Sequence, residues 1–295
     1  MPYPLAPTLS PSRVSAFTDC ALAYRFANLD RLPEPSSPAA VKGTLVHAAL
    51  EALFTYEPAQ RSHEVATACL EHAADQLRDD AELVELGLDE EGFATFVADA
   101  HRLLGKYFEM EDPREVNAVG LELWVEAEVA GVNLRGIIDR LDYLPDGTFR
   151  VVDYKTGRSP SERYEKSKLL GVDTYALLLE HVIGVRPSSV RLLYLGDGTS
   201  LTCRPSQQNT RFVEMKVGAV WQSIQRLNAT DSFKPNPGKL CDWCSFQAWC
   251  PSFGGNPDEA RALGETLRIE RRAAKEAAGT IADLDQPLPF ADTGS

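Results

Sequence analysis

Apolar and polar residues follow a period of about 3.6 residues over much of the chain, which is the spacing of a helix with one buried face. Leu45, Ala49 and Leu53, for example, recur on one such face. A serine followed by a proline, Ser10 and Pro11, is a typical helix start. These patterns predict helices over residues 9–29, 41–56, 63–111 with a break near its middle, 161–183, 207–228 and 257–278.

The period changes to two after the third helical stretch. Apolar residues there alternate with polar ones such as Glu122 and Glu126, which predicts a half-buried strand. Turns at Gly131 and Gly147 separate it from two more strands, so the three form an antiparallel meander. The predicted strands cover 120–130, 132–144, 149–157 and, after the next helix, 189–195. This order predicts an α+β fold with an αβββαβ core and a mixed sheet.

Composition restricts the class of protein. The 295 residues are 44% hydrophobic and 25% charged, as in folded globular chains, which excludes a disordered or fibrous protein. No apolar run approaches the roughly 18–20 residues that cross a bilayer. The first residues lack the basic and apolar regions of a signal peptide, so we expect a cytoplasmic protein.

The formal net charge of −13 argues by itself against a protein that binds nucleic acid. The distribution changes that picture, because residues 71–115 hold 14 acidic and only 4 basic residues. We expect this acidic helical segment, an insertion over 57–115, to form a solvated layer outside the core. The stretch 150–168 is locally basic by contrast.

Two aspartates end neighbouring strands of the meander. Asp139 lies in GIIDRLD and Asp153 in VVDYKTG, with Lys155 two residues further on the same face of the strand. Adjacent carboxylates repel unless a cation lies between them, and Mg²⁺ or Mn²⁺ prefers such oxygen ligands. A lysine beside such a centre orients an attacking water, which suits phosphodiester hydrolysis. A surface ladder of ion pairs is the alternative.

His47 and Glu51 lie four residues apart on one face of the second predicted helix. Imidazole completes a Mn²⁺ or Mg²⁺ site if this helix packs against the meander, with Glu51 supporting it. A purely structural histidine is the alternative.

These segments together, G-x-x-x-H-x-x-x-E, GIIDRLD and VVDYKTG, resemble the PD-(D/E)XK nuclease superfamily in its RecB-type exonuclease branch, over residues 9–253. The resemblance implies a restriction-endonuclease-like core. It also implies that His47, Asp139, Asp153 and the main-chain carbonyl of Tyr154 bind Mg²⁺ or Mn²⁺, and that Lys155 assists the water.

The family often carries a Q-x-x-x-Y motif in the helix after the meander. Tyr175 matches its tyrosine, but Gly171 stands in place of the glutamine, so Tyr175 is equally explained as a core aromatic residue. If the substrate is DNA, basic side chains should line its approach. These are Arg150, Arg158, Arg163, Lys166 and Lys168.

Three cysteines close together, Cys241, Cys244 and Cys250, form a metal-ligand pattern, and Cys20 is the natural fourth ligand. The arrangement resembles the iron–sulfur subset of RecB-like nucleases, such as the AddB nuclease domain and CRISPR-associated exonucleases, which implies a [4Fe–4S] cluster. Zn²⁺ at the four cysteines is the alternative. Aromatic residues between the cysteines either shield this centre or stack on bases: Trp243, Phe246 and Trp249.

The sequence thus predicts a nuclease domain over 9–253, with the cysteine segment at 233–253, followed by a charged helix and mobile tail over 254–295. We expect a metal-dependent DNA exonuclease of repair or recombination, acting on single-stranded DNA or free ends. The chain lacks the G-x-x-x-x-G-K-[ST] loop of an ATP motor, so any helicase is a separate partner. The alternative is a non-catalytic DNA-binding or assembly subunit of a helicase–nuclease or CRISPR adaptation complex.

Overall fold

The computed structural model describes residues 2–160 and 162–284, with side chains outside 161–170 and 275–284. The chain divides into two compact units. The larger unit consists of Pro4–Ser15 and Pro35–Thr230, and the smaller one of residues 2–3, 16–34 and 231–284.

The helices are α1 (Pro11–Asp19), α2 (Ala21–Tyr24), α3 (Pro38–Thr55), α4 (His63–Leu77), α5 (Ala81–Glu85), α6 (Glu90–Met110), α7 (Glu162–Ile183), α8 (Gln207–Thr230) and α9 (Pro257–Leu284). A π-helical stretch covers Arg25–Asp30, and 3-10 turns cover Pro58–Gln60, Pro113–Glu115, Lys239–Trp243, Gln247–Trp249 and Pro251–Phe253. The strands are β1 (Thr8–Leu9), β2 (Ala118–Val129), β3 (Val132–Tyr143), β4 (Phe149–Lys155), β5 (Ser189–Tyr194) and β6 (Thr199–Cys203).

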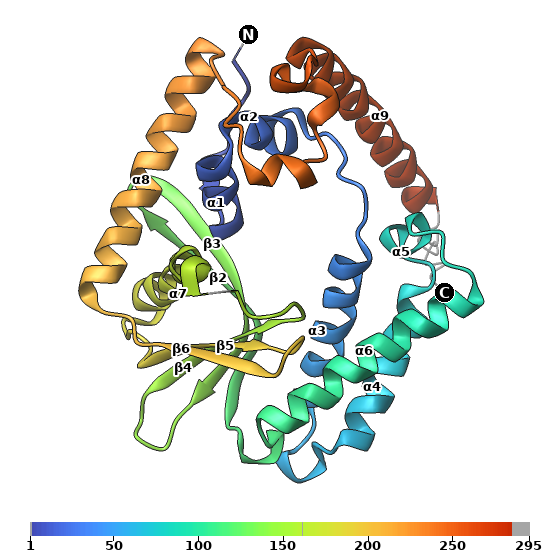
Figure 1. Ribbon diagram of the computed structural model, residues 1–295, viewed down its shortest axis with the longest axis vertical. Coiled ribbons are helices and arrows are strands. Elements are labelled where there is room, and N and C mark those ends of the chain that lie inside the picture. The colour runs from blue at the N-terminus through green and yellow to red at the C-terminus, as the bar shows by residue number, and fades with distance from the viewer. Residues whose placement is uncertain (1, 161, 285–295) are drawn as a thin grey trace, which may run out of the picture. The chain divides into compact units, whose positions relative to one another are not determined.

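One mixed sheet forms the centre of the larger unit, in the order β1-β3-β4-β5-β6 with β2 paired to β3 (Figure 1). Strands β2, β3 and β4 form the predicted antiparallel meander, and β5 runs parallel to β4. Gly131 and Gly147 adopt positive φ angles of 78° and 79° in the two turns, a conformation that glycine adopts without strain. The α+β class, the mixed sheet and the order α3-β2-β3-β4-α7-β5 are therefore confirmed.

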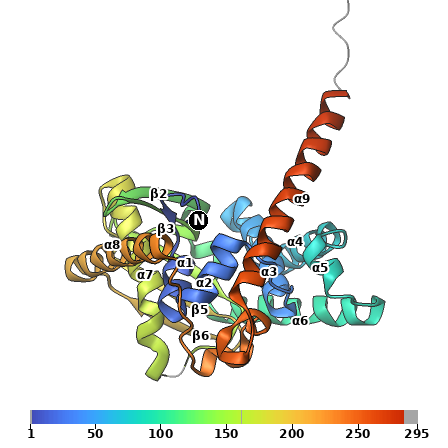
Figure 2. The same cartoon turned by 90° about the horizontal axis from the view of Figure 1, so that it is seen from above.

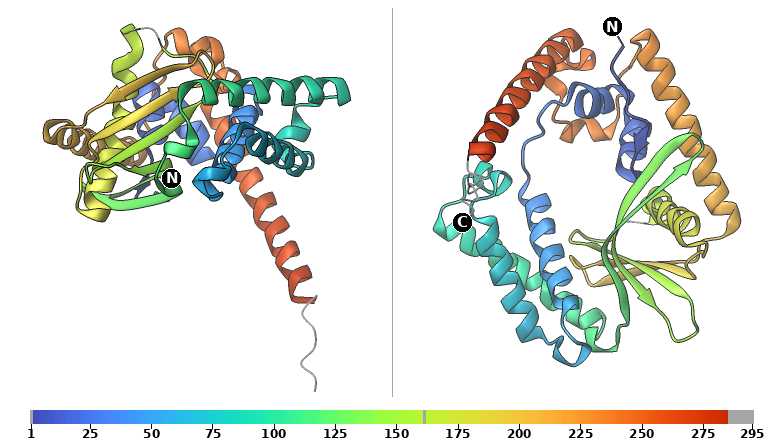
Figure 3. Two further views of the ribbon diagram at one scale, coloured as in Figure 1. Left: turned by 90° about the horizontal axis from the view of Figure 1, so that it is seen from below. Right: turned by 180° about the vertical axis from the view of Figure 1, so that it is seen from behind.

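Helices cover both sides of this sheet. Helices α7 and α8 lie on one side, and α3, α4 and α6 lie on the other (Figures 1 and 3). The second side encloses a large apolar core that includes Leu45, Leu53, Leu104 and Tyr107. The acidic insertion is thus more than a solvated layer, because its inner faces supply much of this core. Its helices break near Gly87, as predicted, and again after α4.

Helix α3 begins earlier than the predicted start at residue 41. Pro38 is the first helical residue, and Ser37 caps the helix by accepting a hydrogen bond from the amide of Ala40 at 3.1 Å. Proline suits this position because the amide that it lacks would have no partner in the helix. The helix therefore has additional residues before His47.

In the smaller unit, segments more than 200 residues apart in sequence pack together. The amide of Leu22 donates to the carbonyl of Lys234 at 3.2 Å, and the Asn236 side chain donates to the carbonyl of Asp19 at 2.9 Å. The predicted helix over 9–29 breaks at Cys20, which has an extended backbone. Figure 2 shows α9 as one long helix of this unit. Among the described helices, none is both long and apolar enough to cross a membrane.

Candidate active site

The candidate site lies where β3 and β4 separate. Their ladder of paired residues runs up to Arg140 opposite Val152, and the next residues along the two strands are Asp139 and Asp153. Instead of a backbone bond between the strands, the amide of Tyr154 donates to Oδ2 of Asp139 at 2.6 Å. The Asp139 carboxylate therefore accepts a hydrogen bond that a backbone carbonyl would accept in a continuous ladder. This bond holds the carboxylate in place where the two strands separate.

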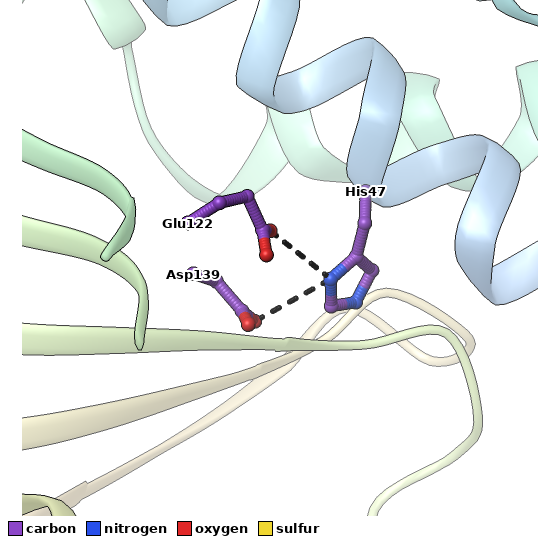
Figure 4. A group of neighbouring side chains, drawn as sticks. All are labelled: His47, Glu122 and Asp139. Carbon is purple, nitrogen blue, oxygen red and sulfur yellow. Dashed lines mark ion pairs between the residues drawn. The ribbon is translucent and has the colours of Figure 1, made fainter. Parts of the chain in front are cut away.

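Helix α3 brings His47 to this point. Its Nδ1 lies 3.6 Å from Oδ2 of Asp139 and 3.9 Å from Oε1 of Glu122 (Figure 4). Its Nε2 lies 3.0 Å from the carbonyl oxygen of Tyr154, which can only accept, so Nε2 carries a hydrogen. Within the described residues, potential ligand atoms of His47, Glu122 and Asp139 lie within 4.8 Å of one another. The ring is thus oriented with Nδ1 toward both carboxylates.

Glu122 is the residue of this group that sequence reasoning missed. The alternation along its strand placed it among the solvent-facing residues, whereas the structure points its carboxylate at His47. Its backbone has a φ of 40°, a left-handed conformation that a glutamate rarely adopts. The signal that would have found it is the hairpin register, because it lies between the pairs Leu121–Arg140 and Leu123–Ile138 and hence opposite Asp139.

Asp153 and Lys155 form the second half of the site. They lie on the same face of β4, and Nζ of the lysine is 2.6 Å from Oδ2 of the aspartate. The Asp153 side chain is 6% exposed and that of Lys155 is 46% exposed. A buried carboxylate of this kind does not belong to a surface ladder of ion pairs, so the structure disfavours that alternative.

The electrostatics of the site indicate an excess of negative charge. Burial, and then the charge of Asp153, raises the pKa of Asp139 to about 7. Burial alone would lower the pKa of His47, but the nearby carboxylate of Glu122 and the charge of Asp139 outweigh burial and raise it. Burial would likewise lower the pKa of Lys155, and the charge of Asp153 raises it instead. Such a cluster is suited to binding a cation.

The predicted supporting residues lie around this group. Glu51 lines an open pocket of about 420 Å³ together with His47, Gly43 and Glu122. Burial and the charge of Glu122 raise the pKa of Glu51. His47 and Glu51, which the sequence placed on one face of this helix, therefore line one wall of the candidate site.

Tyr175 lies on α7 against Gly136 of β3. A Cβ atom at position 136 would approach its ring to 3.0 Å, so glycine allows this close packing. Burial, followed by the charges of Asp153 and Asp139, raises the pKa of the tyrosine. Tyr175 is therefore half-buried against β3, within the electrostatic reach of the carboxylates.

The basic residues expected along the DNA approach have different environments. Arg158 is exposed. Arg150 instead forms an ion pair with the buried carboxylate of Asp142 at 2.9 Å, so its charge is already neutralised within the fold. The side chains of Arg163, Lys166 and Lys168 lie outside the described part of the chain.

The four candidate cysteine ligands all belong to the smaller unit, and none of them forms a disulfide. The amide of Asn236 donates to Sγ of Cys20, and the amide of Gly238 donates to Sγ of Cys241, both at 3.4 Å. Burial raises the pKa of the Cys244 thiol; a hydrogen bond from the amide of Phe246 opposes this, and the charges of the other three cysteines, including Cys250, add to it. Among the described residues, the ligand atoms that lie within 4.8 Å of one another as a group belong to His47, Glu122 and Asp139, and no cysteine sulfur joins such a group.

The aromatic residues of the cysteine segment have unlike environments. Phe246 is buried and packs against Phe26, with ring centroids 5.7 Å apart, as a shielding residue would. Trp243 is 79% exposed, so it does not shield the centre from solvent.

Comparison with known proteins gives both phage relatives and a solved structure. The Gene 69 protein of Mycobacterium phage D29 is 25% identical over 277 residues, which cover 84% of this chain and 97% of that protein. The Gene 69 protein of Mycobacterium phage L5 is 26% identical over 148 residues, covering 49% and 47%. A solved structure of a candidate exonuclease from Eubacterium rectale has a TM-score of 0.54 at 14% identity, covers 80% of this chain and 86% of its own, and is similar in fold.

A family model also matches most of the chain. The family model for the PD-(D/E)XK nuclease superfamily matches residues 8–251, a span that contains α3, the meander and all four candidate cysteine ligands. The same span holds the carboxylates and the lysine described above. The chain therefore belongs to the PD-(D/E)XK nuclease superfamily.

Proposed function

We propose that this nuclease is a Mg²⁺- or Mn²⁺-dependent deoxyribonuclease that acts as an exonuclease on single-stranded DNA or free DNA ends, in repair or recombination. The observation that carries the proposal is the convergence of His47, Glu122 and Asp139 within 4.8 Å. One imidazole and two carboxylates fit a hard divalent ion that prefers oxygen ligands. Family membership supports hydrolysis of a nucleic acid.

The protein groups have distinct parts in this chemistry. A bound divalent ion would polarise the scissile phosphate and lower the pKa of a bound water. Hydrogen bonding of the Tyr154 carbonyl to Nε2 leaves Nδ1 of His47 as the ligand atom, as in many metal sites. The family resemblance implies this carbonyl as a further ligand, but it lies on the Nε2 side of the ring, so it would have to leave this hydrogen bond to reach an ion at Nδ1. Asp153 completes the acidic group and positions Lys155.

Lys155 would contact the reacting atoms. Its ammonium group is fixed by Asp153 yet half-exposed, so it can donate a hydrogen bond to the attacking water or to a phosphate oxygen. DNA would approach past Arg158 and Lys168, with Glu51 and Tyr175 supporting the site.

The four cysteines, in this proposal, hold a [4Fe–4S] cluster in the smaller unit. Hydrogen bonds from main-chain amides to Cys20 and Cys241 support ligation by thiolates, because such bonds stabilise negatively charged sulfur. The cluster would be structural, since it would tie together segments from the two halves of the sequence. Zn²⁺ at the same four ligands is the competing assignment.

The first experiment is degradation of end-labelled single-stranded DNA by anaerobically purified protein, with and without Mg²⁺ or Mn²⁺. Lys155→Ala should slow cleavage about 100- to 1,000-fold, the usual loss of one transition-state donor. Lys106→Ala is the matched control, because it removes a lysine from an equally short ion pair, with Glu109, on the exposed surface. It should cleave like the wild type.

Two results would contradict the proposal. Full activity of Lys155→Ala would show that the lysine has no part in the reaction. Tight DNA binding by the wild type without cleavage under any metal condition would instead favour the non-catalytic subunit.

A further inference from the structure

The hairpin of β2 and β3 exposes two large apolar side chains beside one another. Trp124 is 54% exposed and Ile137 is 42% exposed, and the two residues are direct cross-strand partners. Partners in an antiparallel pair project to the same face, with their Cβ atoms about 5 Å apart. They therefore form one apolar surface rather than two scattered residues.

This surface is continuous with the candidate metal site. Ile137 lies two residues before Asp139 on β3, and two residues of a strand span roughly 7 Å. Trp124 is paired with Ile137, so it lies at the same level of the hairpin. The indole thus lies about one strand repeat from the carboxylates proposed to act on the scissile phosphate.

The third member of the surface is a cation. The guanidinium carbon of Arg135 lies 5.4 Å from the centroid of the Trp124 ring. Arg135 also lies two residues before Ile137, on the same face of β3. An exposed indole beside an arginine is the combination that binds single-stranded nucleic acid, because the ring stacks on a base and the guanidinium attracts the phosphate.

We propose that Trp124 is the stacking platform for a base of the DNA strand next to the scissile phosphate, with Ile137 and Arg135 flanking it. The inference rests on the proposed deoxyribonuclease function. The occupant is a nucleobase because the surface combines a flat aromatic ring with a guanidinium group and adjoins the metal site; Glu126, the cross-strand partner of Arg135, offsets its charge, so stacking rather than net charge supplies the affinity. Stacking of this kind accepts any base, so the platform favours unpaired strands without fixing their sequence.

The test compares Trp124→Ala with Trp124→Phe, which keeps an aromatic ring. Fluorescence anisotropy of a labelled single-stranded oligonucleotide measures affinity, and steady-state cleavage gives KM and kcat. Trp124→Ala should weaken binding and raise KM roughly 5- to 150-fold, the range for one stacked base, while kcat changes little. Trp124→Phe should recover most of the affinity.

Tyr143→Ala is the matched control, because Tyr143 is another exposed aromatic residue on β3. It should bind DNA like the wild type. A single abasic nucleotide moved along the oligonucleotide provides a second readout. One position should weaken binding to the wild type, and the same substitution should have no further effect in Trp124→Ala.

The outcomes separate the two proposals. If the wild type cleaves DNA and Trp124→Ala has the same KM and the same response to abasic positions, the stacking platform is wrong and the nuclease function stands. If the wild type neither binds nor cleaves DNA, both are wrong.

Discussion

At the scale of single residues, the backbone of Glu122 determines where a candidate metal-binding carboxylate points. Its left-handed backbone costs about 1–3 kcal/mol relative to an ordinary strand residue. The ladder pairs on either side, at Leu121 and Leu123, hold it in this conformation. As a result, the carboxylate points toward His47 and not in the direction that the regular pleat would give it. The strained backbone of this residue thus contributes to the geometry of the candidate metal site.

Glu122→Asn should separate stability from metal binding. Asparagine tolerates a positive φ better than glutamate, and the change removes one charge from a crowded acidic group. The metal-free variant should be more stable by about 1 kcal/mol, and its Mn²⁺ affinity should fall at least about 10-fold. Denaturant unfolding and isothermal titration measure the two effects.

Glu128→Asn, an exposed glutamate of the same strand, is the control and should change neither quantity. Unaltered Mn²⁺ affinity in Glu122→Asn would remove this residue from the ligand group.

Much of the candidate site was visible in the sequence. The placement of Asp139, Asp153 and Lys155 follows from two short motifs on adjacent strands, and periodicity put His47 on the polar face of its helix. Glu122 was not visible because its role depends on a distortion that breaks the alternation of its strand. A period of two predicts where a side chain points only while the strand stays regular.

At the scale of elements, a buried ionic network joins the end of α6 to the strands of the site. Arg140 is completely buried and contacts Glu111 at 2.5 Å, Asp142 at 2.7 Å and the hydroxyl of Tyr154 at 2.7 Å. Glu111 also pairs with Arg191 of β5 at 3.0 Å. The network therefore connects β3, β4 and β5 directly behind the carboxylates.

This network was not predictable from charge patterning. Glu111 belongs to the acidic segment expected to face solvent, yet its side chain is largely buried. Composition distinguishes an acidic segment from a neutral one, but it does not show which acid will meet a buried arginine from a strand 29 residues away.

Glu111→Gln should reduce stability and its dependence on pH. Burial alone would raise the pKa of Glu111, but Arg140 outweighs burial and lowers it below the ordinary value of 4.5. The stability from this carboxylate is therefore complete above pH 4.5 and is lost as the pH falls toward the lower native pKa. The variant should lose about 3–5 kcal/mol near pH 7, because the buried Arg140 keeps Asp142 but loses one of its two carboxylates and Arg191 loses its partner, and it should show a flatter profile in acid.

Urea unfolding between pH 3 and 7 measures this effect. Glu109→Gln, from an exposed ion pair on α6, should lose less than about 1 kcal/mol. Equal losses in the two variants would mean that the buried network contributes no more than a surface pair.

At the scale of the whole molecule, the described chain passes between the two units more than once, because Pro4–Ser15 belongs to the larger unit and the segments on either side of it to the smaller one. Sequence patterns predicted one nuclease domain over 9–253 and did not predict this division. Periodicity reports neighbours within a helix or a strand, whereas the smaller unit depends on contacts such as that of Asn236 with Cys20, 216 positions apart. The cysteine spacing was the one signal in the sequence that linked these segments.

Cys20→Ser tests whether a metal centre maintains that link. Closing a loop of more than 200 residues restricts the unfolded chain, so losing a centre at Cys20, Cys241, Cys244 and Cys250 should cost roughly 4–5 kcal/mol, as for a long disulfide loop. Anaerobic protein should be brown in the wild type and colourless in the variant, with iron lost and a lower melting temperature. Cys203→Ser, in the larger unit, should keep its colour and melting temperature.

A colourless wild type with one bound zinc would assign the site to Zn²⁺. Equal metal content and an equal melting temperature in the wild type and Cys20→Ser would exclude Cys20 as a ligand.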